Sequence, residues 1–132
     1  MYEKIIIASG PVIVEDKKVL LNQSSGDDYW KFCGGQPLVN ETLQENSQRR
    51  VKEEMGIDVK VINPEPFFLF IQQRKKGVEK DIILIHWLSA RIGEISSGPD
   101  VQKWDWFFLD KLPDNLAPNI IPTLRHFGFI KK

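Results

Sequence analysis

The stretch from Cys33 to Ile57 reads CGGQPLVNETLQENSQRRVKEEMGI. It begins with a glycine pair, continues as a loop and ends in a segment with helical periodicity. Thr42, followed three residues later by Glu45, forms the capping-box pattern that starts many α-helices. Gly56 supplies the left-handed residue on which many helices end. The sequence therefore predicts a helix between Thr42 and Gly56, preceded by a loop.

Two faces of this predicted helix differ in character. One stripe recurs every four residues and is expected to pack inward: Leu43, Ser47, Val51 and Met55. At about 100° per residue, the adjoining face carries Asn46, Arg50, Glu53 and Glu54. Two carboxylates so close on one face repel each other unless a positive charge lies between them. Either a divalent cation or a nearby arginine can supply that charge, and the sequence leaves both open.

This stretch resembles the Nudix box of the MutT/Nudix hydrolase family. In that pattern a glycine is followed after five residues by glutamate, and after seven more by Arg-Glu-aliphatic-x-Glu-Glu-x-Gly-aliphatic. The residues that match it at the right spacing are Gly35, Glu41, Arg49, Val51, Glu53, Glu54, Gly56 and Ile57. One position departs from the family, because Arg50 stands where a glutamate is expected.

The resemblance implies a fold class, the α/β/α sandwich, in which a mixed sheet carries a helix on each face. It covers most of the chain, which is expected to form a single domain over residues 1–132. The periodicity of the remaining sequence predicts about seven strands and two helices. The expected strands are 4–15, 18–22, 29–32, 57–61, 67–71, 81–90 and 104–108, and the second helix is 119–127.

Local patterns add detail to this expected sheet. Gly10-Pro11 is expected to interrupt the first strand, and Asp16-Lys17 to form the tight turn of a hairpin. Residues 67–71 are apolar on both faces, which predicts an interior strand. The segment 72–80 is read as a charged turn between two strands.

Composition limits the partners of the chain. Its 18 basic and 18 acidic residues balance, so charge gives no reason to expect a nucleic-acid or membrane partner. The single cysteine, Cys33, excludes an internal disulfide and fits a reducing cytoplasm. The apolar run near the N-terminus is too short to span a membrane and lacks the layout of a cleavable signal. A small molecule is the expected partner, and the oligomeric state is left open.

The resemblance assigns roles to the residues of the box. Glu53 and Glu54 are expected to hold a divalent ion, joined by the backbone carbonyl of Gly35. Carboxylate and carbonyl oxygens suit Mg²⁺ or Mn²⁺, which are hard cations. Glu41 and Arg49 are expected to brace the loop against the helix. Gly35 is expected to permit a backbone conformation closed to other residues.

Two candidates lie outside the box. Asp105, directly before Trp106, stands where one branch of the family has a further acidic ligand, and the alternative is an exposed strand residue. Asn119 resembles the loop asparagine that contacts the base in the MutT branch, and the alternative is a cap of the last helix. His86, in an apolar strand, is expected to be structural.

The resemblance implies a hydrolase that cleaves the diphosphate linkage of a nucleoside diphosphate joined to another group. The candidate catalytic residues are Glu53, Glu54, Arg50 and Asp105, and the general base is left open among Glu53, Asp105 and an acidic residue of a later loop. The alternative is a nucleotide-binding module that has lost hydrolysis, with Arg50 contacting phosphate directly. The substrate is left open among nucleoside triphosphates, ADP-ribose, nucleotide sugars and dinucleoside polyphosphates.

Overall fold

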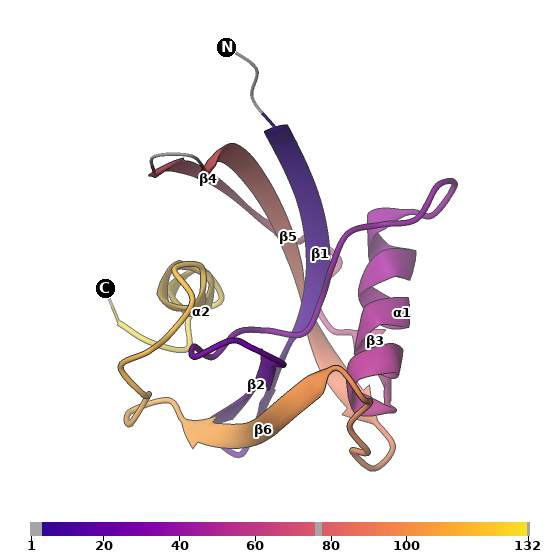
Figure 1. The fold of residues 1–132 in the computed structure, drawn as a ribbon. Helices are drawn as coiled ribbons and strands as arrows, with labels where there is room; N and C mark the ends of the chain where they lie inside the picture. The colour runs from indigo at the N-terminus through magenta and orange to yellow at the C-terminus, as the bar shows by residue number, and fades with distance from the viewer. Residues whose placement is uncertain (1–3, 76–77, 132) are drawn as a thin grey trace.

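A computed structural model describes residues 4–75 and 78–131 of the chain, which form one mixed sheet and two helices (Figure 1). The elements in chain order are β1 (Lys4–Glu15), β2 (Lys18–Ser24), α1 (Leu43–Met55), β3 (Asp58–Val61), β4 (Phe67–Lys75), β5 (Val78–Ile92), β6 (Val101–Phe108) and α2 (Ile120–His126). In the described part of the chain, no helix combines the length and apolarity needed to cross a membrane.

The sheet is built around β1 and β5, which run parallel to each other. The strand order is β3-β5-β1-β2-β6. β4 also pairs with β5, along residues 78–86, whereas β3 pairs with residues 89–92 of the same strand. All pairings other than β1 with β5 are antiparallel. The β1–β2 hairpin turns at Asp16 and Lys17, whose φ angles of 51° and 65° are those of a type I′ turn. The mixed sheet and the tight turn confirm two expectations from the sequence.

Each face of the sheet carries one helix and one core. The face under α1 buries Val51 and Met55 against the other members of its cluster, which are Ile13, Leu20, Cys33, Ile57 and Val59. The face under α2 buries Ile120 and Leu124 against Val12, Val19, Leu21, Phe32 and Ala117. Neighbours along β1 and β2 alternate between the two cores, as successive side chains of a strand must. Figure 1 shows α1 and α2 on opposite sides of the sheet, which confirms the sandwich.

The expected interruption of the first strand at Gly10-Pro11 is wrong, because β1 is continuous. The Ser9 N–H points away from β5 and donates to the Gly35 carbonyl at 3.0 Å. Two residues on, the nitrogen of Pro11 faces the same way, so the missing N–H removes no bond to β5. The glycine at position 10 is required for a separate reason. A Cβ there would collide with the backbone carbonyl of Cys33, where the loop crosses β1.

Gly10→Ala is therefore expected to lower the free energy of unfolding by about 2 kcal/mol, because neither backbone can move without breaking strand pairing. Urea unfolding of the variant and the wild type measures the effect. Gly26→Ala is the control, since a Cβ there meets nothing within 4 Å and only the positive φ of 89° is strained. A loss at Gly10 no larger than that at Gly26 would contradict the close crossing.

Two expectations about the second half of the sheet are wrong. The strand at 67–71 is not interior: β4 lies at an edge beside β5, and Phe68 and Phe70 are 64% and 56% exposed. The charged segment 72–80 is mostly strand, since β4 continues to Lys75 and β5 begins at Val78; residues 76 and 77 lie outside the described range. An apolar run shows that a strand is favoured, but not which of its faces is covered.

The expected strand at 29–32 is replaced by two isolated bridges. Lys31 pairs with Asn22 of β2, and Trp30 pairs with Leu116, just before α2. The segment thus makes single bridges to two different parts of the chain and no continuous ladder with either. Its course takes the chain across the sheet to the glycine pair at Gly34.

Candidate functional site

Helix α1 is fixed at both ends as the sequence predicts. The Thr42 hydroxyl accepts from the Glu45 N–H at 3.0 Å, and the Glu45 carboxylate accepts from the Thr42 N–H at 2.9 Å. At the other end Gly56 adopts a φ of 69° and its N–H donates to the Lys52 carbonyl. The helix therefore holds its polar face in one rotation relative to the loop before it.

Arg49 joins that loop to the helix. Its Nε donates to Glu41 Oε2 at 2.7 Å and its Nη1 donates to Glu53 Oε2 at 3.0 Å. The hydrogen bond from Arg49 holds the pKa of each of these carboxyls below its usual range. Both carboxylates are therefore ionised at neutral pH, and the contact of Glu41 with Arg49 has the geometry expected of a brace.

Arg50 lies between the two carboxylates of the predicted metal site. Its Nη1 donates to Glu53 Oε1 at 2.9 Å, and its Nη2 donates to Glu54 Oε2 at 3.0 Å. A Cβ at Gly35 would collide with this guanidinium. Gly35 does not adopt a positive φ, so the expected backbone reason for the glycine is wrong: it makes room for Arg50. Of the two ways to relieve carboxylate repulsion, the structure shows the arginine.

Glu54 is the buried member of the pair, with only 5% of its surface exposed. The Gly34 N–H donates to its Oε1 at 2.9 Å. Burial raises the pKa of Glu54, and the bonds from Gly34 and Arg50 act in the opposite direction. Burial likewise raises the pKa of the neighbouring Cys33 thiol well above its usual value, with a further contribution from the Glu54 charge. Cys33 is a buried thiol, and its pKa keeps it protonated.

The carbonyl of Gly35 is turned away from the carboxylates. It accepts from the Ser9 N–H at 3.0 Å and from Asn46 Nδ2 at 2.7 Å. The carbonyl that faces the cluster is that of Gly34, which accepts from Arg50 Nε at 3.3 Å. Ser9 and Asn46 are both buried and hold the loop in place. The sequence placed Asn46 on the helix face of the carboxylates but did not predict this role for it, and it contained no signal for Ser9.

The oxygen atoms of this cluster have the right chemistry for Mg²⁺ or Mn²⁺, because carboxylate and carbonyl oxygens are what these ions prefer. Arg50 holds one oxygen of each carboxylate and competes with an ion for them. Within residues 4–75 and 78–131, no three histidine, cysteine or acidic side chains converge as a metal site. Glu53, Glu54 and Gly34 would hold an ion only when Arg50 moves aside.

Asp105 is not brought to this cluster. It lies exposed on β6, where its Oδ1 accepts from the Trp106 N–H at 2.8 Å. Trp104 and Trp106 pack into the core under α1, so alternation along the strand turns Asp105 to the other face. Asp105 is therefore an exposed strand residue, which is the alternative that the sequence left open.

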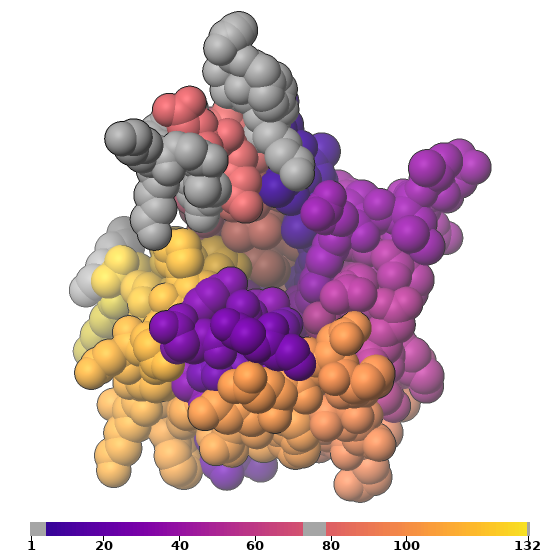
Figure 2. All heavy atoms as spheres, in the orientation of Figure 1, coloured from indigo at the N-terminus to yellow at the C-terminus, as the bar shows by residue number. Residues whose placement is uncertain are grey.

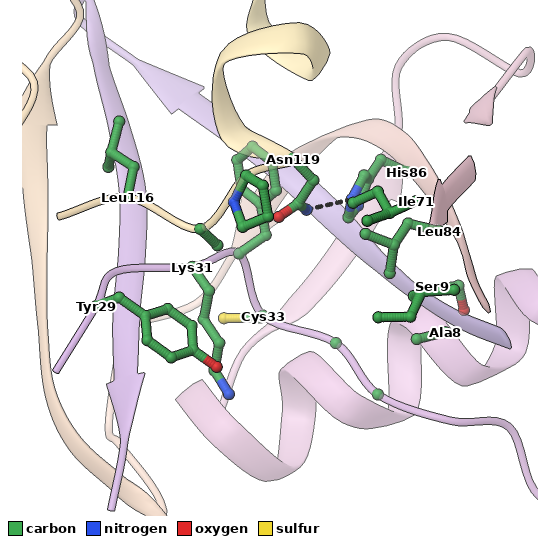
Figure 3. A pocket seen from close by; sticks show the side chains of 16 residues that line it. Ala8, Ser9, Tyr29, Lys31, Cys33, Ile71, Leu84, His86, Leu116 and Asn119 are labelled. Atoms are coloured by element: carbon green, nitrogen blue, oxygen red, sulfur yellow. Dashed lines mark hydrogen bonds between the residues drawn. The ribbon is translucent and has the colours of Figure 1, made fainter. Parts of the chain in front are cut away.

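A cavity of about 530 Å³ opens beside the glycine pair. Figure 3 shows the side chains that line it. Such a volume suits a small-molecule ligand. Ile71, Ile82 and Leu84 form its apolar wall on β4 and β5, and Tyr29 and Lys31 border it on the loop after β2. Figure 2 shows that loop lying against the segment before α2. A hydrogen bond joins the two, in which the Trp30 N–H donates to the Asn115 carbonyl at 2.8 Å.

Asn119 and His86 close the end of the cavity near α2. Asn119 Nδ2 lies 3.0 Å from His86 Nε2, and His86 Nδ1 lies 3.1 Å from the Gly10 carbonyl oxygen. The Asn119 side chain makes no capping hydrogen bond to α2, so the capping alternative is wrong. Sequence reasoning missed His86 as a pocket residue; its signal was one polar residue within an otherwise apolar strand.

Comparison with known proteins agrees with this geometry. The NUDIX domain family matches residues 6–127 of the chain. Among solved structures, the MutT NUDIX hydrolase from Burkholderia pseudomallei superposes with a TM-score of 0.73 at 23% identity, covering 93% of this chain and 98% of that one. The E. coli ORF135 protein gives 0.71 at 27% identity, covering 95% and 89%.

A C. elegans Ap4A hydrolase in a binary complex gives a TM-score of 0.72 at 22% identity, covering 93% of this chain and 95% of that one. The search among curated proteins finds no match. The family match spans both helices and every strand between them, and it includes the complete glycine-to-isoleucine box with its one substitution at Arg50. The chain therefore belongs to the Nudix family of pyrophosphohydrolases.

Proposed function

We propose that this Nudix hydrolase cleaves the diphosphate linkage of a nucleoside diphosphate joined to another group. The observation that carries this is the layout of the cavity: Asn119 lies at one end, and Gly34 and Gly35, which lead to the carboxylates, lie at the other. In this proposal a base lies at the amide and its phosphates lie toward Gly34, which donates to Glu54. The C. elegans neighbour, an Ap4A hydrolase, acts on a molecule of this general type.

The charges along the cavity support the phosphate end of the proposal. Lys31 borders the cavity and forms an ion pair with Asp27 at 3.2 Å. It lies close enough to Glu54 to influence the pKa of that carboxyl. A phosphate near Gly34 would therefore meet Lys31 from one side and Arg50 from the other, and both are attracted to its oxygens.

Divalent-ion chemistry completes the proposed reaction. A divalent ion held here, Mg²⁺ or Mn²⁺, would supply charge to neutralise phosphate oxygens and to activate or position the attacking water. Glu53, Glu54 and the Gly34 carbonyl would hold it, once a phosphate draws Arg50 away from their oxygens. Glu53 is about half exposed and ionised, and the general base stays open between it and an acidic residue of a later loop.

The contacts of Arg50 favour a second candidate, a nucleotide-binding module without turnover. In that case Arg50 remains between the carboxylates and contacts phosphate in place of an ion. The free, buried Cys33 fits the cytoplasmic location that we infer for either candidate.

A panel of nucleotides, incubated with Mg²⁺ or Mn²⁺ and analysed for products, tests the proposal. We expect hydrolysis of at least one compound that contains a diphosphate linkage.

Glu54→Gln should weaken Mn²⁺ binding about tenfold and reduce turnover, while thermal melts show an intact fold, because one anionic ligand becomes neutral. Equal Mn²⁺ affinity of variant and wild type would remove Glu54 from the site.

The panel also separates the two candidates. Binding of a nucleotide without products at any ion concentration would support the binding module. Absence of both binding and hydrolysis for every nucleotide would overturn both candidates.

A further inference from the structure

His86 is held in one tautomer by its surroundings. Its Nδ1 lies 3.1 Å from the carbonyl oxygen of Gly10, which can only accept. Nδ1 therefore carries the ring hydrogen and Nε2 carries a lone pair. Only 3% of His86 is exposed, and burial lowers its pKa to about 4. The ring stays neutral at physiological pH, so Nε2 remains an acceptor.

Two rigid neighbours keep the ring in this orientation. Gly10 lies in the parallel ladder between β1 and β5, directly opposite His86 itself. Phe32 contacts the imidazole edge to face, with ring centroids 5.0 Å apart. The carbonyl that sets the tautomer therefore belongs to the core of the sheet, and a ligand entering the cavity does not displace it.

The tautomer decides which way the Asn119 amide faces. Oxygen and nitrogen of an amide are assigned from their hydrogen-bond partners. Because Nε2 accepts, the group 3.0 Å away must be the amino group of Asn119. An amide oxygen at that place would set its lone pair against the lone pair of Nε2. Figure 3 shows the Asn119 oxygen turned away from His86.

The Asn119 oxygen is left as an unused acceptor at the cavity. Asn119 is 8% exposed and borders the cavity. Within residues 4–75 and 78–131, no group donates a hydrogen bond to its Oδ1. Because this oxygen has no protein partner and borders the cavity, a ligand N–H donor that reaches it forms a hydrogen bond in place of water.

We propose that His86 is a specificity-determining positioning residue: by fixing the Asn119 amide, it makes this end of the cavity a hydrogen-bond acceptor. The cavity then selects rings that present an N–H donor, such as an amino group, over rings that present only acceptors at the same edge. The proposal rests on the proposed function for the nucleotide nature of the ligand. His86 acts through Asn119 and does not itself contact the ligand.

Matched nucleotides that differ by one amino group test this proposal. Nucleoside monophosphates serve as probes, because they contain no diphosphate linkage to be cleaved. The pairs are AMP with purine riboside 5′-monophosphate, and CMP with the 2-pyrimidinone riboside 5′-monophosphate. We expect wild type to bind the amino-bearing member of at least one pair about tenfold to a hundredfold more tightly by calorimetry.

Variants separate positioning from general damage to the cavity. In His86→Leu the Asn119 amide can rotate and offer either group, so the ratio within the preferred pair should fall to near one. In Ile71→Val, which alters an apolar wall residue, the ratio should persist even if both affinities change. A wild-type ratio near one in every pair, with nucleotides hydrolysed in the panel, would overturn this inference and leave the proposed function intact.

A measurement on the wild-type protein tests the inference even if the His86→Leu variant does not fold. Long-range ¹H–¹⁵N spectra of wild type distinguish the protonated from the unprotonated ring nitrogen of His86. We expect an unprotonated Nε2 at neutral pH, with and without AMP. A hydrogen on Nε2 would overturn the inference, because Asn119 would then have to present its oxygen to His86. Failure of every nucleotide to bind would overturn the proposed function, and this inference with it.

Discussion

Replacing Arg50 with glutamate is expected to tighten Mn²⁺ binding about a hundredfold and to raise turnover of any substrate found in the panel. The guanidinium bonds to Glu53 and Glu54 at 2.9 and 3.0 Å, so it occupies the oxygens that an ion needs. Two unit charges about 4 Å apart interact at about 4 kcal/mol with an effective dielectric of 20. Partial exposure of Arg50 and its mobile side chain reduce this to about 2–3 kcal/mol, or roughly two decades.

Two further variants identify the cause of that gain. Arg50→Gln removes the positive charge without adding a ligand and should give an intermediate affinity. Arg125→Glu makes the same change of charge on α2, away from the carboxylates, and should leave Mn²⁺ affinity unchanged. A side-by-side Mg²⁺ and Mn²⁺ series measures all four proteins. If Arg50→Glu bound metal no better and turned over more slowly, arginine would be part of the working site.

His86→Gln is expected to make the fold less sensitive to acid. The pKa of His86 is about 4 in the folded protein and about 6.5 in the unfolded chain. Between these values the unfolded state binds a proton that the folded state does not, so the stability due to neutral His86 is complete above pH 6.5. It is lost as the pH falls toward 4. The loss amounts to about 2–3 kcal/mol by pH 4.5.

Urea unfolding at pH 7 and at pH 4.5 measures this difference. Glutamine does not titrate, so the variant should lose about 2–3 kcal/mol less than wild type over the interval, whatever its stability at pH 7. The carboxyls are the same in both proteins, and their contribution cancels in the comparison. Equal losses would show that His86 is not held neutral by burial.

Periodicity and capping were sufficient for the helix and much of the sheet, because those signals are local. Thr42, Glu45 and Gly56 set the ends of α1 through contacts within a few residues. The edge position of β4 could not be predicted, because exposure of Phe68 depends on which strands lie beside it. The continuity of β1 through Pro11 depended on a neighbour, Gly35, that is far along the chain.

The candidate site divides in the same way. The spacing of the box placed Glu53, Glu54 and Arg50 on one helix face, and the structure joins them in one cluster. It could not show that the Gly35 carbonyl turns toward Asn46, since that is decided by the crossing of the loop over β1. The contact of Asn119 with His86 joins residues 33 positions apart, and no local pattern indicates such a pair.

The parallel pairing of β1 with β5 has a consequence for how the chain folds during synthesis. Gly10 and His86, which face each other in this pair, are 76 residues apart. Such non-local pairing raises the contact order and slows folding. The strand that supports the glycine loop cannot complete its pairing until β5 has been synthesised, and the edge of β1 that pairs with β5 stays open for that interval. We expect early translation intermediates to depend on chaperones, and the cluster around Glu54 to assemble only after most of the domain has been made.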